Sequence, residues 1–325
     1  RRALEAIDLD LSADFTFPKR IEIHAGDRTA PLASYTLGSN FKHGFGAEYS
    51  VMSRADLQMG LWRACAAHAR IQMAPGQTAA QSPDVDLIVG ADGVRSTTRS
   101  LVPGARQTAS SGYVACRSVV DMEAIKAAGI PLDAVSLWLG KNAHAVIYPL
   151  PGNTVNIVLS TKGTVSGSGW SVAAPARLIG SILNKLDRKL SILQEAAQFS
   201  QWNIDTVPAS SKWHLGRIAL VGDAAHAMPP FAAQGSAMAL EDAIVLAAEL
   251  ENHTSIEGGL QAFAQSRMPR VAKVAQLSHA NAKLYHMSGP LAAARDLTLK
   301  ATPQAVINAR MAWIYDWTPP ELPLG

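Results

Sequence analysis

Two short apolar runs, each ending at a turn of glycine and aspartate, constrain the fold of this 325-residue chain more than any other feature. Residues 85–90 (VDLIVG) lead into Ala-Asp-Gly at 91–93, and residues 218–221 (IALV) lead into Gly222 and Asp223. Short apolar runs bounded by glycine are typical of buried strands, and strands buried on both faces are mostly parallel. The sequence therefore predicts an α/β sheet with an aspartate at the end of two of its strands.

Between these two strands the sequence has a different character. Residues 112–161 contain four short runs rich in β-branched and aromatic residues, separated by turn residues at 140–142 and 151–153. This pattern is typical of an antiparallel meander. Together with the flanking strands it predicts an α/β nucleotide-binding domain that is interrupted by a sheet facing the substrate.

Helical spacing of apolar residues predicts the remaining elements. A first helix is expected from Arg54 to about Ala69, with Ser53 as its N-cap. Another helical stretch is expected near 175–199, and helices are expected from Ser236 to about Leu250 and onward to roughly residue 311. The proline-containing tail is expected to be irregular.

Composition excludes several classes of function. Hydrophobic residues make up 48% of the chain and charged residues 17%, which is typical of a well-buried globular protein. The net charge of +3 is too small to indicate nucleic-acid binding. Cys65 and Cys116 form no metal-ligand or disulfide pattern, so no metal is expected and a cytoplasmic setting fits best. No apolar run is long enough to predict a membrane span.

The segment VGDAAHAMPPFAAQG, residues 221–235, combines groups suited to opposite ends of one ligand. Ligands of open α/β sheets bind at the carboxyl ends of strands, where the carboxylate of Asp223 can accept hydrogen bonds from hydroxyl groups. The residues from Gln234 open a helix whose free N–H groups attract negative charge. A flavin fits, because its ribitol carries hydroxyls and its reduced ring becomes anionic. The alternative is a tight turn with Asp223 as a cap. His226 is expected to be structural, bonded to the loop backbone.

Several segments resemble the FAD-dependent aromatic hydroxylases, the class A flavoprotein monooxygenases. GRIALVGDAAHAMPPFAAQGSAMALEDA (216–243) resembles the family's Gly-Asp fingerprint, and DLIVGADGVRSTTR (86–99) resembles its Asp-Gly fingerprint. SRADLQMGL (53–61) and HAVIYPL (144–150) match in the family's order. The resemblance covers most of residues 1–317, and the paired fingerprints are specific.

The resemblance implies roles for the cofactor-binding residues. Asp223 would bind the flavin ribitol, and the backbone turn of Gln234, Gly235 and Ser236 would lie under the pyrimidine edge of the ring. Arg54 matches an arginine that reaches FAD in the family. Without the resemblance, Arg54 would be interpreted as a surface residue in the first turn of a helix.

The Asp-Gly fingerprint carries two further residues. Asp92 and Arg95 match positions associated with FAD and NAD(P)H. The alternative interpretation for both is a β-turn with solvated charges.

His144 and Tyr148 lie four residues apart, so on a strand both face the same way. Taken alone this pattern favours a polar strand face in water. The resemblance implies instead that both residues lie beside the substrate, and it implies that the carbonyl of Pro230 contacts the substrate. Phe231 departs from relatives that carry a polar group here and cannot take a proton. A base would then be His144 or Tyr148, unless another substituent such as an amine activates the substrate.

The implied architecture is α/β: a Rossmann-like FAD-binding domain interrupted by an antiparallel β-sheet substrate domain, with a helical C-terminal region. We expect residues 1–105 to form part of the FAD-binding domain, 106–205 the substrate domain, and 206–325 the continuation with C-terminal helices. No Gly-x-Gly-x-x-Gly unit for the FAD pyrophosphate is found. The sequence is therefore expected to be trimmed at its N-terminus and within 69–84, whether by omission or as a natural fragment.

The implied activity is hydroxylation of a small aromatic substrate with NAD(P)H and O2 through a C4a-hydroperoxyflavin, in aromatic compound catabolism. Two alternatives stay open: a non-hydroxylating flavin oxidoreductase or epoxidase on the same scaffold, and a degenerate non-enzymatic fragment. The choice between NADH and NADPH, the regiochemistry and the oligomeric state, including a homodimer, are not fixed by the sequence.

Overall fold

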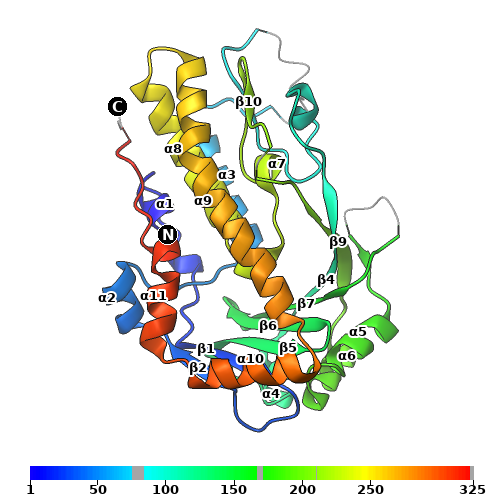
Figure 1. Cartoon of the computed structure of the whole chain (residues 1–325). Helices are drawn as coiled ribbons and strands as arrows, with labels where there is room; N and C mark the ends of the chain where they lie inside the picture. Colours follow the sequence, from blue (N-terminus) through cyan, green and yellow to red (C-terminus); the bar gives the residue numbers. More distant parts are fainter. Residues whose placement is uncertain (75–83, 167–170, 210, 323–325) are drawn as a thin grey trace.

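The computed structural model describes residues 1–74, 84–166, 171–209 and 211–322, which form a small sheet, a large sheet and a set of helices. Figure 1 shows the two sheets at different levels of the molecule, with the long helix α9 (Ile256–Tyr285) running between them. Part of the segment 69–84, where a shortened loop was expected, lies outside the described residues. No helix in the described ranges is long and apolar enough to cross a membrane.

The small sheet consists of β10 (His214–Leu215), β11 (Ile218–Leu220) and β3 (Ile88–Gly90). Strands β11 and β3 are parallel, with Ala219 opposite Val89, as predicted. The prediction that residues 85–90 are fully buried was wrong: β3 is shorter, and Val89 is 44% exposed. The reason is position, because β3 pairs with one strand only among the described residues and leaves its other side uncovered.

The large sheet has eight strands in the order β2-β1-β5-β6-β7-β4-β9-β8. All its pairs are antiparallel except β1 with β5. Strands β5, β6 and β7 form the predicted meander, and β4 pairs with β7 rather than with β5. The strands are β1 (Arg20–Ala25), β2 (Ala33–Thr36), β4 (Ala109–Asp121), β5 (Ala134–Gly140), β6 (Ala143–Leu150), β7 (Thr154–Lys162), β8 (Val172–Ala173) and β9 (Ser200–Thr206).

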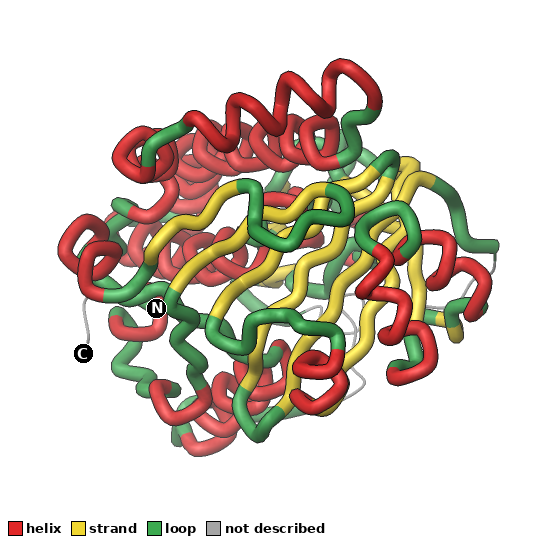
Figure 2. The backbone as a smooth tube through the Cα atoms, turned by 90° about the horizontal axis from the view of Figure 1, so that it is seen from below, coloured by secondary structure: helices red, strands yellow, loops and turns green. Residues whose placement is uncertain are grey.

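Strands β1 and β2 therefore lie in the large sheet although they precede residue 106. The division of the chain at 105 and 205 stays a prediction. Figure 2 shows the strands of the large sheet side by side, with helices around them.

Alternation along the strands gives the large sheet two unlike faces. On β6, Ala143, Ala145 and Ile147 point into a buried apolar cluster that also contains residues of the helices α4 (Met122–Ala127), α5 (Ala176–Leu183) and α6 (Leu193–Ala196). His144, Val146 and Tyr148 must then point to the opposite face. That face is covered near His144 by the end of α9, because the ring of Tyr285 packs against His144 with centroids 5.2 Å apart.

The C-terminal helices are those predicted, extended by a few residues. They are α8 (Gly235–Asn252), α9, α10 (Gly289–Ala301) and α11 (Gln304–Tyr315), whereas the short helix α7 (Asp223–His226) lies in a segment that was expected to be a loop. Helix α9 packs against α8 and contacts β10 near its start, and its end reaches the large sheet. The same helix therefore touches both sheets.

Helix α3 (Arg54–Ala67) begins where the sequence predicts, because the Ser53 hydroxyl accepts a hydrogen bond from the Asp56 N–H at 3.0 Å. None of its residues is buried, and Trp62 is 48% exposed. Its apolar residues instead line an open cleft described below. The other short helices are α1 (Arg2–Glu5) and α2 (Ser39–Phe45).

Candidate functional site

The turn after β11 places a carboxylate beside the start of α8. Gly222 has φ of +58° and ψ of −141°, a conformation that side-chain-bearing residues rarely adopt. A Cβ at Gly222 would lie 3.0 Å from the Cβ of Ala239 in α8, so the turn packs directly on that helix. Asp223, one residue later, is exposed and begins α7. No side chain caps α8, whose first residue is Gly235. The turn at Gly222, which precedes the Asp223 carboxylate, is therefore held against the first turns of α8.

An open cleft of about 460 Å³ connects α3 with the start of α8. Arg54 and Ser236, which lie far apart in the sequence, both line it. The other lining residues are mostly apolar: Leu57, Gln58, Leu61, Trp62, Cys65, Ile71 and Met73. The structure thus brings two of the predicted cofactor residues to one cleft, with apolar surface beside them that suits a flat ring system.

Asp92 organises its own turn. One of its carboxylate oxygens accepts hydrogen bonds from the backbone N–H of Thr97 at 2.9 Å and of Thr98 at 3.0 Å, and from both hydroxyls. Burial opposes ionisation, but hydrogen bonds from Ser96 and Thr98 outweigh it and lower the pKa of Asp92. This geometry matches the alternative interpretation of Asp92 as a turn residue, and its role toward a cofactor stays a prediction. Arg95 lies in the same turn and also has a non-covalent partner.

Arg99, the last residue of the same fingerprint, joins the two fingerprint loops. It is buried, and its guanidinium donates to the carbonyl of Ala224 at 3.0 Å and to the carbonyl of Val94 at 2.7 Å. One side chain therefore ties the turn after β3 to the turn after β11.

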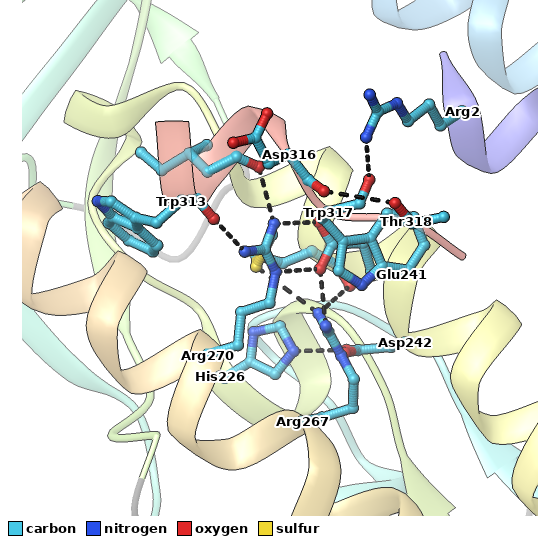
Figure 3. A network of polar contacts seen from close by, with 12 residues as sticks. Arg2, His226, Glu241, Asp242, Arg267, Arg270, Trp313, Asp316, Trp317 and Thr318 are labelled. Atoms are coloured by element: carbon cyan, nitrogen blue, oxygen red, sulfur yellow. Dashed lines mark hydrogen bonds and ion pairs between the residues drawn. The ribbon is translucent and has the colours of Figure 1, made fainter. Parts of the chain in front are cut away.

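A buried network of charged groups fixes α8, α9 and the Gly-Asp turn to one another (Figure 3). Asp242 of α8 accepts hydrogen bonds from the Gly222 N–H at 2.9 Å, from Nε2 of His226 at 2.5 Å and from Nε of Arg267 at 2.9 Å. Glu241 accepts from Nη1 of Arg267 at 2.7 Å and from Nε and Nη2 of Arg270, each at 2.7 Å. The network therefore starts at the turn and ends on α9.

The network extends to the C-terminal segment. Arg270 donates to the carbonyls of Trp313 and Ile314, and Arg2 donates to the carbonyl of Trp317 (Figure 3). His226 is structural, as predicted, but its partner is the Asp242 carboxylate rather than the loop backbone. Burial opposes ionisation of Asp242, yet the hydrogen bond and charge of His226 and the charge of Arg267 hold its pKa below its ordinary value.

The loop that follows α7 reaches the open face of the large sheet. Its short helix η5 (Pro230–Ala232) is held by α9, since the Ser278 hydroxyl donates to the Pro229 carbonyl and Nδ2 of Asn281 donates to the Phe231 carbonyl at 2.9 Å. The Pro230 carbonyl accepts from the Ala233 N–H at 3.0 Å, which leaves one of its two lone pairs free of backbone partners.

Phe231 packs edge-on against His144, with ring centroids 4.9 Å apart. His144 is buried, and its Nδ1 lies 2.7 Å from Nε2 of His286, which immediately follows α9. Burial and the neighbouring His286 lower the pKa of His144 well below its ordinary value, and burial lowers the pKa of His286 to about 4. Both imidazoles are therefore neutral at pH 7, and each has one nitrogen that accepts a hydrogen bond.

Tyr148 lies on the same face, near a cationic side chain. Nε of Arg117 donates to Oδ1 of Asn156 at 2.6 Å, and Asn156 stands opposite Tyr148 in the sheet register. Burial raises the pKa of Tyr148, although the nearby charge of Arg117 works against this. Tyr148 therefore keeps its proton at pH 7 and can donate a hydrogen bond.

Three buried polar atoms on or beside this face have no hydrogen-bond partner within the described residues. They are Nδ2 of Asn156, Oγ of Ser160, which stands opposite His144 in the register, and Nδ1 of His286. Buried polar atoms are normally satisfied by protein, water or ligand. Their gathering around His144 and Tyr148 is what a site for a polar aromatic molecule would show.

Sequence reasoning missed Arg99, Asp242, Arg267, Arg117 and His286. Arg99 and the Glu241-Asp242 pair lie inside the quoted fingerprints, so attention to their charges would have singled them out. Arg117 faces the same way as Tyr113 and Ala115 by strand alternation, a weak signal. His286 carries no local signal, because only the path of α9 brings it to β6.

The chain is similar to a family of FAD-binding proteins and to named aromatic hydroxylases. A family model described as FAD binding domain matches residues 66–278. The 3-hydroxybenzoate 6-hydroxylase of Klebsiella oxytoca is 28% identical over 306 residues, covering 86% of this chain and 75% of the relative. The 3-amino-4-hydroxybenzoate 2-monooxygenase of Streptomyces cremeus is 28% identical over 338 residues, covering 98% of this chain and 83% of the relative.

Solved structures show the same fold. A salicylate hydroxylase in complex with substrate superposes with a TM-score of 0.76 at 22% identity, covering 97% of this chain and 86% of that one. HpxO of Klebsiella pneumoniae, complexed with FAD and uric acid, gives a TM-score of 0.79 at 20% identity, covering 100% of this chain and 87% of that one.

The charge network gives a first prediction. Replacing Asp242→Asn removes the carboxylate partner of His226 and leaves Arg267 with Glu241 as its anionic partner in the network, so we expect a loss of about 3–5 kcal/mol in the free energy of unfolding. Urea unfolding of the variant and the wild type at pH 7 measures it. Glu251→Gln, at an exposed position of α8, is the matched control and should change little. A loss no larger than that of the control would contradict the network's importance.

The stability lost in Asp242→Asn should also depend on pH. The pKa of Asp242 is lower in the folded state, so its stabilisation is fully present above the ordinary pKa of about 3.9 and is lost as pH falls through the folded-state value. The difference in unfolding free energy between wild type and Asp242→Asn should therefore shrink below about pH 4.

The turn gives a second prediction. Gly222→Ala forces a side chain into a glycine-only conformation and against Ala239, so we expect about 1–3 kcal/mol of destabilisation. Thermal unfolding measures it. Gly44→Ala, where a Cβ meets no atom within 4 Å, is the control and should be neutral or stabilising. Equal stability of the two variants would show that the turn tolerates a side chain.

Proposed function

Since the chain belongs to the FAD binding domain family and is a flavin-dependent monooxygenase of the aromatic hydroxylases, we propose that it hydroxylates a small ring that carries both a phenolic hydroxyl and a carboxylate. The observation that carries the proposal is the contact of Phe231 with His144. Through it, the loop expected to bind flavin meets the sheet face expected to bind substrate.

The residues present fit a flavin. Gly222 packs closely on Ala239 of α8, and the exposed Asp223 carboxylate follows it in the turn. The uncapped N-terminus of α8 suits negative charge on the ring, and the cleft shared by Arg54 and Ser236 provides apolar surface. Asp223 would hold ribitol hydroxyls, and residues Gln234 to Ser236 would lie at the pyrimidine edge. Asp92 and Arg95 would act indirectly, through the turn after β3.

The small sheet, on this proposal, is part of a Rossmann-like FAD-binding domain that the large sheet interrupts. FAD, when bound, accepts reducing equivalents from NAD(P)H and activates O2 for transfer to the ring. A cytoplasmic location fits the two free cysteines. A homodimer and a role in aromatic catabolism are also part of the proposal.

The substrate face supplies complementary groups. His144 is neutral and accepts a phenolic proton, which makes the ring more electron-rich and thus more reactive toward an electrophilic oxygen. Tyr148 remains protonated and donates a hydrogen bond. The two Nη atoms of Arg117, which have no hydrogen bond within the described residues, suit a carboxylate, as the benzoate names of the relatives suggest. The Pro230 carbonyl, beside Phe231, is a further acceptor.

Cofactor loading and turnover test the proposal. The purified protein should take up FAD and show a visible flavin spectrum, and one or more of 3-hydroxybenzoate, 3-amino-4-hydroxybenzoate and 6-hydroxynicotinate should accelerate NAD(P)H oxidation and yield an oxygenated product. We expect Asp223→Ala to weaken FAD binding about 10–100-fold through lost charged hydrogen bonds, and Glu251→Gln to leave it unchanged. A colourless protein that FAD does not reconstitute defeats the proposal; reduced flavin without oxygenated product indicates a non-hydroxylating oxidoreductase.

Arg117 provides a prediction on the substrate class. Arg117→Met should raise KM for a carboxylated substrate about 10–100-fold with a smaller change in kcat, because a charge-assisted hydrogen bond is lost in both ground and transition states. Turnover of the matched phenol without the carboxylate should not change. Arg310→Met, at an exposed position of α11, is the control variant. Equal KM increases for both substrates would assign Arg117 a merely structural role.

A further inference from the structure

We propose that His286 is a positioning residue for the hydroxylation reaction, and that with His144 it forms a two-imidazole relay that takes the phenolic proton of the substrate and releases it on the far side. The proposal rests on the proposed function, because it needs a phenol at Nε2 of His144. It adds a residue from a different element of the fold to that site.

The geometry of the pair leaves only two neutral proton arrangements. Nδ1 of His144 and Nε2 of His286 lie 2.7 Å apart, so one of them donates and the other accepts. If His144 donates from Nδ1, its Nε2 is a free acceptor and the proton of His286 is on Nδ1. If His286 donates from Nε2, His144 carries its proton on Nε2 and Nδ1 of His286 is bare.

Moving between the two arrangements transfers one proton. In the first arrangement, the substrate O–H gives its proton to Nε2 of His144, the Nδ1 proton of His144 moves to Nε2 of His286, and the Nδ1 proton of His286 leaves to water. The products are a phenolate, two neutral imidazoles in the second arrangement, and one released proton. The new N–H at Nε2 of His144 then donates to the phenolate oxygen.

Burial explains why a pair is needed. A lone buried imidazole would become a buried cation on taking the proton, and the lowered pKa of His144 shows that this site disfavours that charge. In the relay no cation persists, because a proton enters at one ring and leaves from the other. Phe231, which packs against His144, cannot share this task because its side chain has no titratable group.

Within the described residues, no carboxylate is found among the groups that shift the pKa of either imidazole. The groups facing the pair are Tyr113 of β4, whose ring centroid lies 5.0 Å from that of His286, Lys162 of β7, whose charge lowers the pKa of His286, and Tyr285 of α9 beside His144. Arg295 of α10 is bound to the Leu284 carbonyl nearby. Nδ1 of His286 is buried without a partner among the described residues, which marks the place where a water would receive the released proton.

Variants of His286 distinguish a role in proton transfer from a role in packing. His286→Gln places an amide where Nε2 of the imidazole lies, so it keeps a hydrogen bond to His144 but carries no proton onward; His286→Leu removes both functions. His279→Gln, an exposed histidine of α9, is the matched control. Each protein is first loaded with FAD, and the flavin spectrum verifies that the variant folds and binds cofactor. The substrate is whichever of 3-hydroxybenzoate, 3-amino-4-hydroxybenzoate and 6-hydroxynicotinate the wild type hydroxylates best.

Two measurements follow: kcat/KM from pH 6 to 9, and the ultraviolet difference spectrum that reports phenolate formation in the bound substrate over the same range. We expect His286→Gln to lose about tenfold or more in kcat/KM near pH 6.5 and progressively less as rising pH ionises the phenol without help. The apparent pKa of the bound phenol should rise in His286→Gln and stay unchanged in His279→Gln. A loss of equal size at every pH, or an unchanged phenol pKa in an active His286→Gln, overturns the relay; a wild type that hydroxylates none of the three overturns the proposed function instead.

Discussion

The carboxylate of Asp242 is the single group on which most of the site depends. It is fully buried, and it binds the backbone of the Gly-Asp turn, the His226 ring and the Arg267 guanidinium at once. Buried charged groups such as Asp242 and Arg267 cost free energy to desolvate, so such a cluster is stable only when its hydrogen bonds are well made. Here they are shared among a turn and two helices. The position of Asp223 is therefore set by the side chains that hold the turn on α8 and α9.

Much of the fold followed from local pattern. The strand before Gly222, the capped helix at Ser53 and the meander of β5 to β7 were all predicted, because period and turn chemistry act over a few residues. Burial of individual elements was less predictable. The sequence of α3 is apolar at helical spacing, yet none of its residues is buried, because burial depends on what lies opposite rather than on the helix itself.

In the candidate site, too, features set by local sequence were predictable, and contacts between distant parts of the chain were not. Arg54 and Ser236 line one cleft, and His144 and Tyr148 share a strand face, whereas the roles of these residues and of Asp223 stay predictions. Partners that come from distant parts of the chain were not predictable. Arg117 of β4 donates a hydrogen bond to Asn156 of the neighbouring strand β7. His286 is hydrogen-bonded to His144, which lies 142 residues earlier in the chain. Such pairs are decided by strand order and by the direction of α9, which one sequence does not reveal.

Arg267 lies in the first half of helix α9, and His286 immediately follows the last residue of the helix. Eighteen residues lie between them, and nineteen steps along a helix correspond to an axial distance of about 28 Å. The length of helix α9 thus sets the distance between the charge network at Arg267 and the pair of His144 and His286. Inserting a single residue between them would swing everything beyond it by about 100° and aim His286 away from β6. The number of residues between Arg267 and His286 therefore matters to the site as much as the two side chains themselves.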